Sequence, residues 1–233
     1  MKLNIHAGHN PAGKIACGAV GFLNESTEAR IIKNEVIRQL QLMDHEVYDC
    51  TCDDGKSVAD VLNKIVSKCN AHDVDLDISI HLNAGKGTGC EVLVYDKKSK
   101  NAIAAAEKIA AHISVALGIK DRGIKCRPDL YVLRNTKAQA LLIEVCFVDN
   151  SIDATCYSAQ AAANAIVKAL TGSIYKEPEA TDVTNDPHID TDMAADPSEI
   201  YYVQVGAFKN KDNAEKLALD LKAKGFNPIV KRG

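Results

Sequence analysis

Up to residue 172 this chain alternates short apolar runs with segments of helical periodicity, and this alternation restricts its fold more than any other feature. The apolar runs that fit strands are Lys2–Ile5, Glu46–Asp49, Leu76–Ile80, Glu91–Tyr95, Leu130–Leu133 and Leu141–Val145. The segments with apolar residues at helical spacing are Glu28–Leu42, Val58–Cys69, Ala102–Leu117 and Ala159–Leu170. Continuous apolar runs are typical of strands that are buried on both faces of a sheet. The pattern predicts an α/β layered domain with a mostly parallel sheet flanked by helices.

The periodicity is lost between Ser173 and Ser198, where three prolines appear and seven acidic residues accompany a single lysine. A segment of this composition has too little apolar surface to fold and predicts a flexible acidic linker. We therefore expect a first domain over residues 1–172, a linker over 173–198 and a small module over 199–233.

The small module has the pattern of one βαβ unit. Tyr201–Phe208 alternates as a strand, Asn210–Lys224 is amphipathic, Gly225 ends that helix, and Phe226–Lys231 predicts a second strand. Its 35 residues are fewer than the roughly 40 that usually fold without disulfides, metals or partners. We expect a partial module that is weakly ordered on its own.

The composition excludes several classes of protein. A net charge of −3 and a pI near 6.2 provide no basic face for nucleic acid. No stretch approaches the roughly 18 uninterrupted apolar residues of a membrane helix. The N-terminal residues 1–6 run directly into a strand, without the apolar stretch of roughly 7–15 residues that a signal peptide requires. We therefore expect no transmembrane segment, no signal peptide, and synthesis in the cytoplasm.

Eight cysteines are present, and in a chain of this length without an export signal we expect free thiols rather than a disulfide framework. Cys50 and Cys52 form one pair, but the second separated pair of a structural zinc site is missing. Cys90 and Cys146 lie in apolar runs and are expected to pack as small hydrophobic side chains.

Three polar residues are placed where strands and helices of such a domain end. His9 follows the first strand, His81 closes the Leu76–Ile80 strand, and Glu25 directly follows Asn24, a favourable helix N-cap. Functional sites in α/β sheets form outside the carboxyl ends of strands. Two histidines and one carboxylate leave a catalytic zinc ion one position for water, whose pKa the metal lowers to about 7. The sequence therefore predicts a Zn²⁺ site and a hydrolase.

Glu144 lies within the apolar run Leu141–Phe147. A carboxylate in such surroundings loses its hydration, and this cost must be offset by a cation or a hydrogen-bonding partner. We predict that Glu144 is the catalytic carboxylate.

Two of these residues have competitors nearby. His6 still lies in the first strand, whereas His9 follows the Ala7–Gly8 turn and can reach outward. Glu28 is one helical turn deeper than Glu25, where it can pair with basic residues on the solvated face. We therefore favour His9 and Glu25. The remaining histidines, His45, His72, His112 and His188, are expected at the surface.

The ordered set of segments through residue 172 resembles the zinc-dependent N-acetylmuramoyl-L-alanine amidases of the third type. The segments that carry this resemblance are His6–His9, Gly18–Gly21, Asn24–Glu25, Ser79–Ala84, Gly89–Val92, Leu130–Arg134 and Leu142–Glu144. The resemblance implies that His9, Glu25 and His81 bind zinc and that Glu144 is catalytic. One departure is Asn10-Pro11, which stands where the family often has a glycine pair. The segment Tyr202–Phe208 with its following helix resembles the first half of a SPOR domain, a peptidoglycan-binding module.

The resemblance implies hydrolysis of the amide bond between N-acetylmuramic acid and L-alanine in peptidoglycan, as in endolysins and autolysins. Asn83 and Arg134 are candidates for substrate binding, although a loop-capping and a surface role fit them equally well. Two alternatives stay open: a catalytically inactive cell-wall binding protein, and a zinc peptidase that cuts within the stem peptide. Without a signal peptide, we expect the protein to reach the cell wall after lysis or through a membrane-perforating, holin-type partner.

Overall fold

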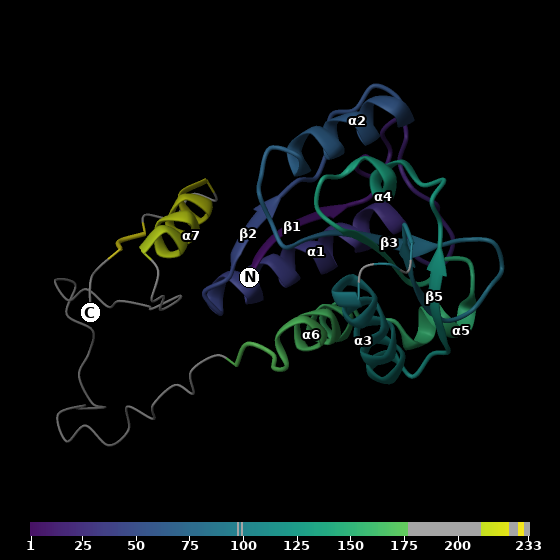
Figure 1. The fold of residues 1–233 in the computed structure, drawn as a ribbon. Coiled ribbons are helices and arrows are strands. Elements are labelled where there is room, and N and C mark those ends of the chain that lie inside the picture. Colours follow the sequence, from purple (N-terminus) through teal and green to yellow (C-terminus); the bar gives the residue numbers. More distant parts are fainter. Residues whose placement is uncertain (97, 99, 177–210, 224–227, 231–233) are drawn as a thin grey trace, which may run out of the picture. The chain divides into compact units, whose positions relative to one another are not determined.

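The computed structural model describes residues 1–96, 98, 100–176, 211–223 and 228–230, and its contacts divide the chain into two compact units, Met1–Ile174 and Tyr175–Gly233. The first unit is a six-stranded sheet between two layers of helices (Figure 1). Its strands are β1 (Lys2–Ala7), β2 (Glu46–Asp49), β3 (Leu76–Asn83), β4 (Cys90–Val94), β5 (Asp121–Cys126) and β6 (Ala140–Phe147). Its helices are α1 (Glu25–Leu42), α2 (Val58–Cys69), α3 (Lys100–Leu117), α4 (Tyr131–Asn135), α5 (Ser151–Cys156) and α6 (Ala159–Thr171).

The strands follow the order β2-β1-β3-β6-β4-β5. Strands β2, β1, β3 and β6 are parallel to one another, β4 is antiparallel to β6, and β5 is parallel to β4. The predicted α/β domain with a mostly parallel sheet is thus confirmed, with mixed pairing at one edge. The carboxyl ends of β1, β3 and β6 therefore meet the amino ends of β4 and β5 on one side of the domain.

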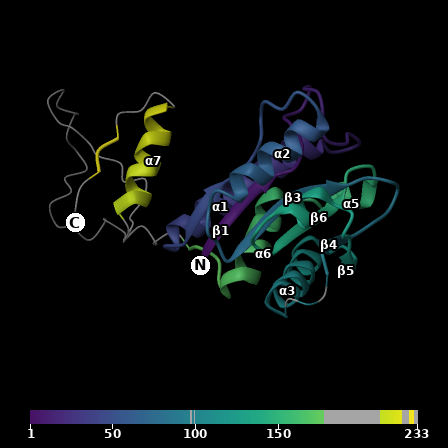
Figure 2. The ribbon, with the colours of Figure 1, turned by 45° about the horizontal axis from the view of Figure 1, so that its top comes forward.

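The two faces of the sheet are covered differently. Alternate residues of β6, Leu141, Ile143 and Val145, belong to the main core together with residues of α1, α3 and α6. Leu142, on the opposite face, packs in a small separate cluster with Leu133 of α4. Figure 2 shows α2 on one side of the sheet and α3 and α6 on the other. Glu144, two residues after Leu142, shares the face of α2 and α4.

Local caps set where the helices begin. The side chain of Asn24 accepts a hydrogen bond from the backbone N–H of Thr27 and starts α1 at Glu25. Ser57 and Ser158 cap α2 and α6 in the same way, and Gly172 ends α6 in the left-handed conformation. The expected helix Val58–Cys69 has the same bounds in the structure.

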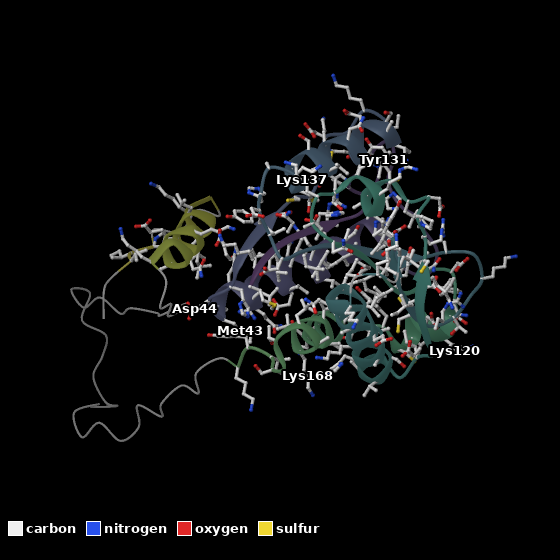
Figure 3. All side chains as sticks on the ribbon, in the orientation of Figure 1. Met43, Asp44, Lys120, Tyr131, Lys137 and Lys168 are labelled. Carbon is white, nitrogen blue, oxygen red and sulfur yellow. The ribbon has the colours of Figure 1, made fainter. Side chains whose placement is uncertain are left out.

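One predicted strand is wrong and one strand was not predicted. Leu130–Leu133, expected as a strand, instead leads into α4, where the N–H groups of Arg134 and Thr136 donate to the carbonyls of Leu130 and Val132. The short helix rests on α2, where the hydroxyl of Tyr131 donates to Asn63 (Figure 3). The sixth strand is β5, which pairs with β4 at the edge of the sheet.

In the second unit the structure describes α7 (Lys211–Ala223), which confirms the helix expected at Asn210–Lys224. The expected strand Tyr201–Phe208 and most of the expected linker lie outside the described residues. Of the expected strand Phe226–Lys231, residues 228–230 are described and have no regular secondary structure. Among the described residues, no helix combines the length and hydropathy that crossing a membrane requires. All eight cysteines are free, and Cys90 and Cys146 lie in the main core as expected.

Candidate metal centre and active site

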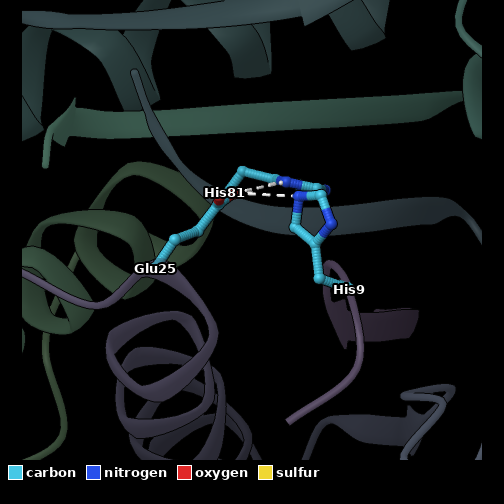
Figure 4. Close-up of side chains that lie close together, drawn as sticks. All are labelled: His9, Glu25 and His81. Atoms are coloured by element: carbon cyan, nitrogen blue, oxygen red, sulfur yellow. Dashed lines mark hydrogen bonds and ion pairs between the residues drawn. The ribbon is translucent and has the colours of Figure 1, made fainter. Parts of the chain in front are cut away.

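The side chains of His9, Glu25 and His81 converge at the carboxyl ends of β1 and β3. Their candidate ligand atoms all lie within 4.8 Å of one another. Oε1 of Glu25 is 2.9 Å from Nδ1 of His81 and 3.3 Å from Nε2 of His9 (Figure 4). The two imidazole rings meet edge to face at a centroid distance of 5.0 Å. The structure therefore brings together the three residues that the sequence predicted as metal ligands.

The ring of His81 packs closely against the backbone next to His9. A Cβ atom at Gly8 would lie 1.9 Å from the ring of His81, so only glycine fits between the strand and that ring. His9 itself has a φ of 61°, a left-handed conformation that is uncommon for a residue with a side chain. Asn10 is buried and bonds with both the N–H and the carbonyl of Gly55. Asn10 thus fixes the loop that carries His9.

Glu25 is held at both of its oxygens. Its Oε2 accepts a hydrogen bond from the N–H of Ala19 at 2.9 Å, and a Cβ at Gly18 would lie 2.5 Å from this same oxygen. Burial acts to raise the pKa of Glu25, but hydrogen bonds from His81 and His9 outweigh it and hold the pKa well below its usual range. The carboxylate is therefore ionised and fixed in orientation.

His81 is largely buried, with 15% of its side chain exposed, and burial lowers its pKa despite the neighbouring Glu25. A neutral imidazole has one nitrogen with a free lone pair, which is the form that binds metals. One carboxylate and two imidazoles form a donor set that suits Zn²⁺. The cluster thus fits a metal site on the chemistry of its donors.

Glu144 lies beside this cluster, because it pairs in register with His81 across β3 and β6. Its Oε2 is enclosed and has no hydrogen-bond partner among the described residues. Burial first, and then the charges of Glu25 and Glu91, raise the pKa of Glu144 to about 8. A carboxyl group in this state responds strongly to any added positive charge.

The competing residues lie elsewhere. His6 is fully buried in β1, 3.4 Å from the hydroxyl of Ser79, and burial lowers its pKa to about 3. Glu28 accepts a hydrogen bond from Tyr157 at 2.9 Å. Neither belongs to the cluster of ligand atoms. His45, His72 and His112 are partly exposed, and His188 lies outside the described residues.

The two candidates for substrate binding lie on the same face as Glu144. Asn83 ends β3, where its side chain donates to Glu91 at 3.0 Å and accepts from the N–H of Ala84. Arg134 is exposed on α4. The sequence analysis did not single out Glu91 or Arg122, which form an ion pair of 2.8 Å next to Asn83. The sequence signal that could have identified Glu91 is a carboxylate at the start of an apolar run.

Comparison with known proteins identifies the family of the chain. The family model described as N-acetylmuramoyl-L-alanine amidase matches residues 4–176, about three quarters of the chain. The chain belongs to this family. The family is zinc-dependent. A second model, the SPOR domain, matches residues 197–233 of this family member.

Individual relatives and structures are similar over the same part of the chain. A 38.4 kDa protein of Clostridium perfringens is 33% identical over an alignment of 187 positions that covers 76% of this chain and 53% of that protein. The N-acetylmuramoyl-L-alanine amidase CwlM of Bacillus licheniformis is 30% identical over 169 residues, 72% of this chain and 61% of the relative. The chain thus spans about half the length of the curated relatives it matches. The solved catalytic domain of an endolysin targeting Clostridia Difficile is 27% identical with a TM-score of 0.68, covering 76% of this chain and 99% of that one.

Proposed function

We propose that this chain is a zinc-dependent hydrolase that cleaves the amide bond between N-acetylmuramic acid and L-alanine in peptidoglycan. The observation that carries the proposal is the cluster of His9, Glu25 and His81 with Glu144 directly beside it. Intact ligands together with this carboxylate favour an enzyme over a cell-wall protein that only binds.

The roles of the residues follow from their environments. His9, Glu25 and His81 would hold the zinc ion, which when bound supplies a Lewis acid for the scissile carbonyl and lowers the pKa of a water molecule. Glu144 takes the proton of the attacking water and returns it to the leaving amine of the stem peptide. The raised pKa of Glu144, about 8, suits a group that must both hold and release a proton near neutral pH. Nearby positive charge lowers this pKa and favours the ionised base.

A peptidase that cuts within the stem peptide is the second candidate, because a metal site alone does not determine which bond is cleaved. The two candidates release different amines. The amidase exposes the amino group of L-alanine at the start of the stem peptide, whereas the peptidase exposes one further along it.

The experiment is therefore digestion of purified sacculi with the zinc-loaded protein, followed by labelling and identification of every new amino terminus. New L-alanine termini are expected, and they should be absent when a chelator is added. New termini only within the stem peptide would identify a peptidase. No new termini, with binding to sacculi retained, would identify a binding protein.

The remaining parts of the chain fit the same setting. We propose that residues 199–233 bind peptidoglycan, since the SPOR model matches this region. We further propose that residues 173–198 form an acidic linker between that module and the catalytic domain.

A further inference from the structure

A row of polar side chains crosses four neighbouring strands on the face of the sheet that carries His81. His81 on β3 pairs with Glu144 on β6, and Glu144 pairs with Glu91 on β4. Paired residues of neighbouring strands point to the same face of a sheet. The row continues to β5, where Arg122 donates from Nε to Oε2 of Glu91 at 2.8 Å. Arg122 thus contacts Glu91, which pairs with Glu144 of the candidate site on the neighbouring strand.

A bulge places Arg122 on this face. Cys90 pairs with Asp121 and Val92 with Ile124, so that Glu91 of β4 lies opposite two residues of β5, Arg122 and Gly123. Gly123 has a φ of 71°, which glycine adopts without strain. An extra residue of this kind reorients the neighbouring side chain, and bulges are frequent next to active sites.

The guanidinium of Arg122 is held on one side and open on the other. Its central carbon lies 5.1 Å from the centre of the Phe147 ring, and its Nε is paired with Glu91. Among the described residues, its two Nη groups have no hydrogen-bond partner, and 32% of its side chain is exposed. Two parallel N–H groups fixed in this way match the two oxygens of a carboxylate.

Glu91 is fully engaged by the protein. It is 8% exposed, its Oε1 accepts from Asn83 and its Oε2 accepts from Arg122. Each of its oxygens thus has a partner within the protein, and its pairing with Nε positions the guanidinium.

The distance along the row indicates which part of the substrate reaches Arg122. Neighbouring strands are about 4.8 Å apart, so β5 lies about 10 Å from Glu144 across the sheet. An extended peptide advances about 3.3 Å per residue, so two residues and the carboxylate carried by the second cover most of this distance. In peptidoglycan the lactyl carboxyl of the sugar is consumed in the scissile amide, and the other carboxylates belong to the stem peptide.

Resting on the proposed function, we propose that Arg122 binds the α-carboxylate of the second residue of the stem peptide, and that Glu91 is its positioning residue. Arg122 then determines specificity: it favours a stem peptide whose second residue carries a free α-carboxylate over one in which this group is amidated. If the ion pair between Arg122 and Glu91 only stabilised the fold, the enzyme would show no such preference.

The test uses the zinc-loaded full chain and two soluble muropeptides with the same tripeptide stem, one with the α-carboxylate and one with the α-carboxamide at the second residue. We expect the wild-type kcat/KM to favour the acid roughly ten- to a hundredfold, mainly through KM, which is the range for a hydrogen bond to a charged group. Arg122→Gln should bring this ratio to about one by weakening only the acid. Binding of the released tripeptide, measured calorimetrically, should show the same loss.

Arg127→Gln is the matched control, because Arg127 lies next to the other end of β5 and is paired with Asp129 by two hydrogen bonds. It should keep the wild-type ratio. If Arg122→Gln does not fold, Arg122→Lys takes its place, since it keeps the charge beside Glu91 but loses the forked geometry; a ratio reduced at least about threefold is expected. Equal cleavage of both muropeptides by the wild type, or an unchanged ratio in the Arg122 variant, overturns the inference alone. Release of no L-alanine terminus from either muropeptide overturns the proposed function and the inference with it.

Discussion

The two faces of the central sheet are built from the same strands and serve different purposes. On the face covered by α1, α3 and α6, side chains such as Ile5, Ile80 and Ile143 are fully enclosed in one large core. The face of α2 and α4 holds two smaller apolar clusters, and polar side chains lie between and beside them. Asp77, Ser79 and Glu144 all point to this second face. The sheet thus separates the large apolar core from the side chains of His81 and Glu144 in the candidate site.

Two consecutive residues of β6 show this difference between the faces most clearly. Ile143 and Glu144 are consecutive in β6 and point to opposite faces, because side chains alternate along a strand. The large core can therefore support the site from behind without supplying any of its chemistry. Substitutions on the two faces should accordingly fail in different ways.

The largest expected effect is on the metal ligands. His9→Ala and His81→Ala should each lose most of the bound zinc and nearly all amidase activity, because a site with three protein ligands is broken by removing one. Metal analysis of the purified variants measures this directly. His112→Ala is a suitable control on an exposed helix surface and should retain about one zinc per chain. Full zinc content in both ligand variants would contradict the assignment.

Glu144→Gln should keep the zinc and the fold but lower kcat by at least about 10²-fold, the scale of a general acid–base contribution. The amide cannot accept the proton of the attacking water. Steady-state kinetics on a soluble muropeptide, with metal analysis of the same sample, checks both parts. Turnover close to that of the wild type would mean that another group is the base.

Substitution of Ile143, the residue before Glu144, should lower stability but not activity. Ile143→Ala should lower the free energy of unfolding by about 2–5 kcal/mol, since it removes a fully buried side chain and leaves a cavity. Below its unfolding transition this variant should keep zinc and most of its activity. Urea unfolding gives the stability, and the muropeptide assay gives the activity. A large drop in kcat without a loss of stability would show that the two faces are not separate.

How far the sequence could predict this arrangement depends on the kind of pattern. Continuous apolar runs identified the parallel strands, and residues at strand and helix ends identified His9, Glu25 and His81. The four-residue run Leu130–Leu133 was misassigned because so short an apolar segment fits a strand and a helix turn equally well. Strand β5 was missed because Asp121–Cys126 is polar, contains a glycine and lies at an edge.

The pairing of Glu91 with Glu144 and Arg122 was beyond sequence analysis for a different reason. It depends on the antiparallel register of β4 against β6 and on a bulge opposite Glu91, both of which are set by contacts between distant segments. No local pattern determines such a register. The residues proposed to bind the metal are thus easier to predict than those proposed to recognise the substrate.

A smaller effect concerns pH and the metal-free protein. The folded state raises the pKa of Glu144 from 4.5 to about 8, so between these values it retains a proton that the unfolded chain releases. The stabilisation of the folded state by this group is therefore fully present below pH 4.5 and is lost as the pH rises to 8. One pKa unit corresponds to about 1.4 kcal/mol, so the loss is a few kcal/mol at most. In the presence of a chelator, Glu144→Gln should become more stable relative to the wild type between pH 5 and pH 8. A constant difference over this range in urea unfolding would contradict the raised pKa.

The smallest effect is expected from removing the second unit. The polar face and the core behind it are built within Met1–Ile174, and the described residues that form the candidate site all lie there. A chain that ends at Gly172 should therefore keep its zinc, its thermal midpoint within a few degrees and its kcat/KM on soluble muropeptides. On intact sacculi it should bind more weakly, because the region that matches the SPOR model is gone. If truncation instead abolishes solubility or activity on soluble muropeptides, the C-terminal region contributes to the catalytic fold, and the proposed boundary at residue 172 is wrong.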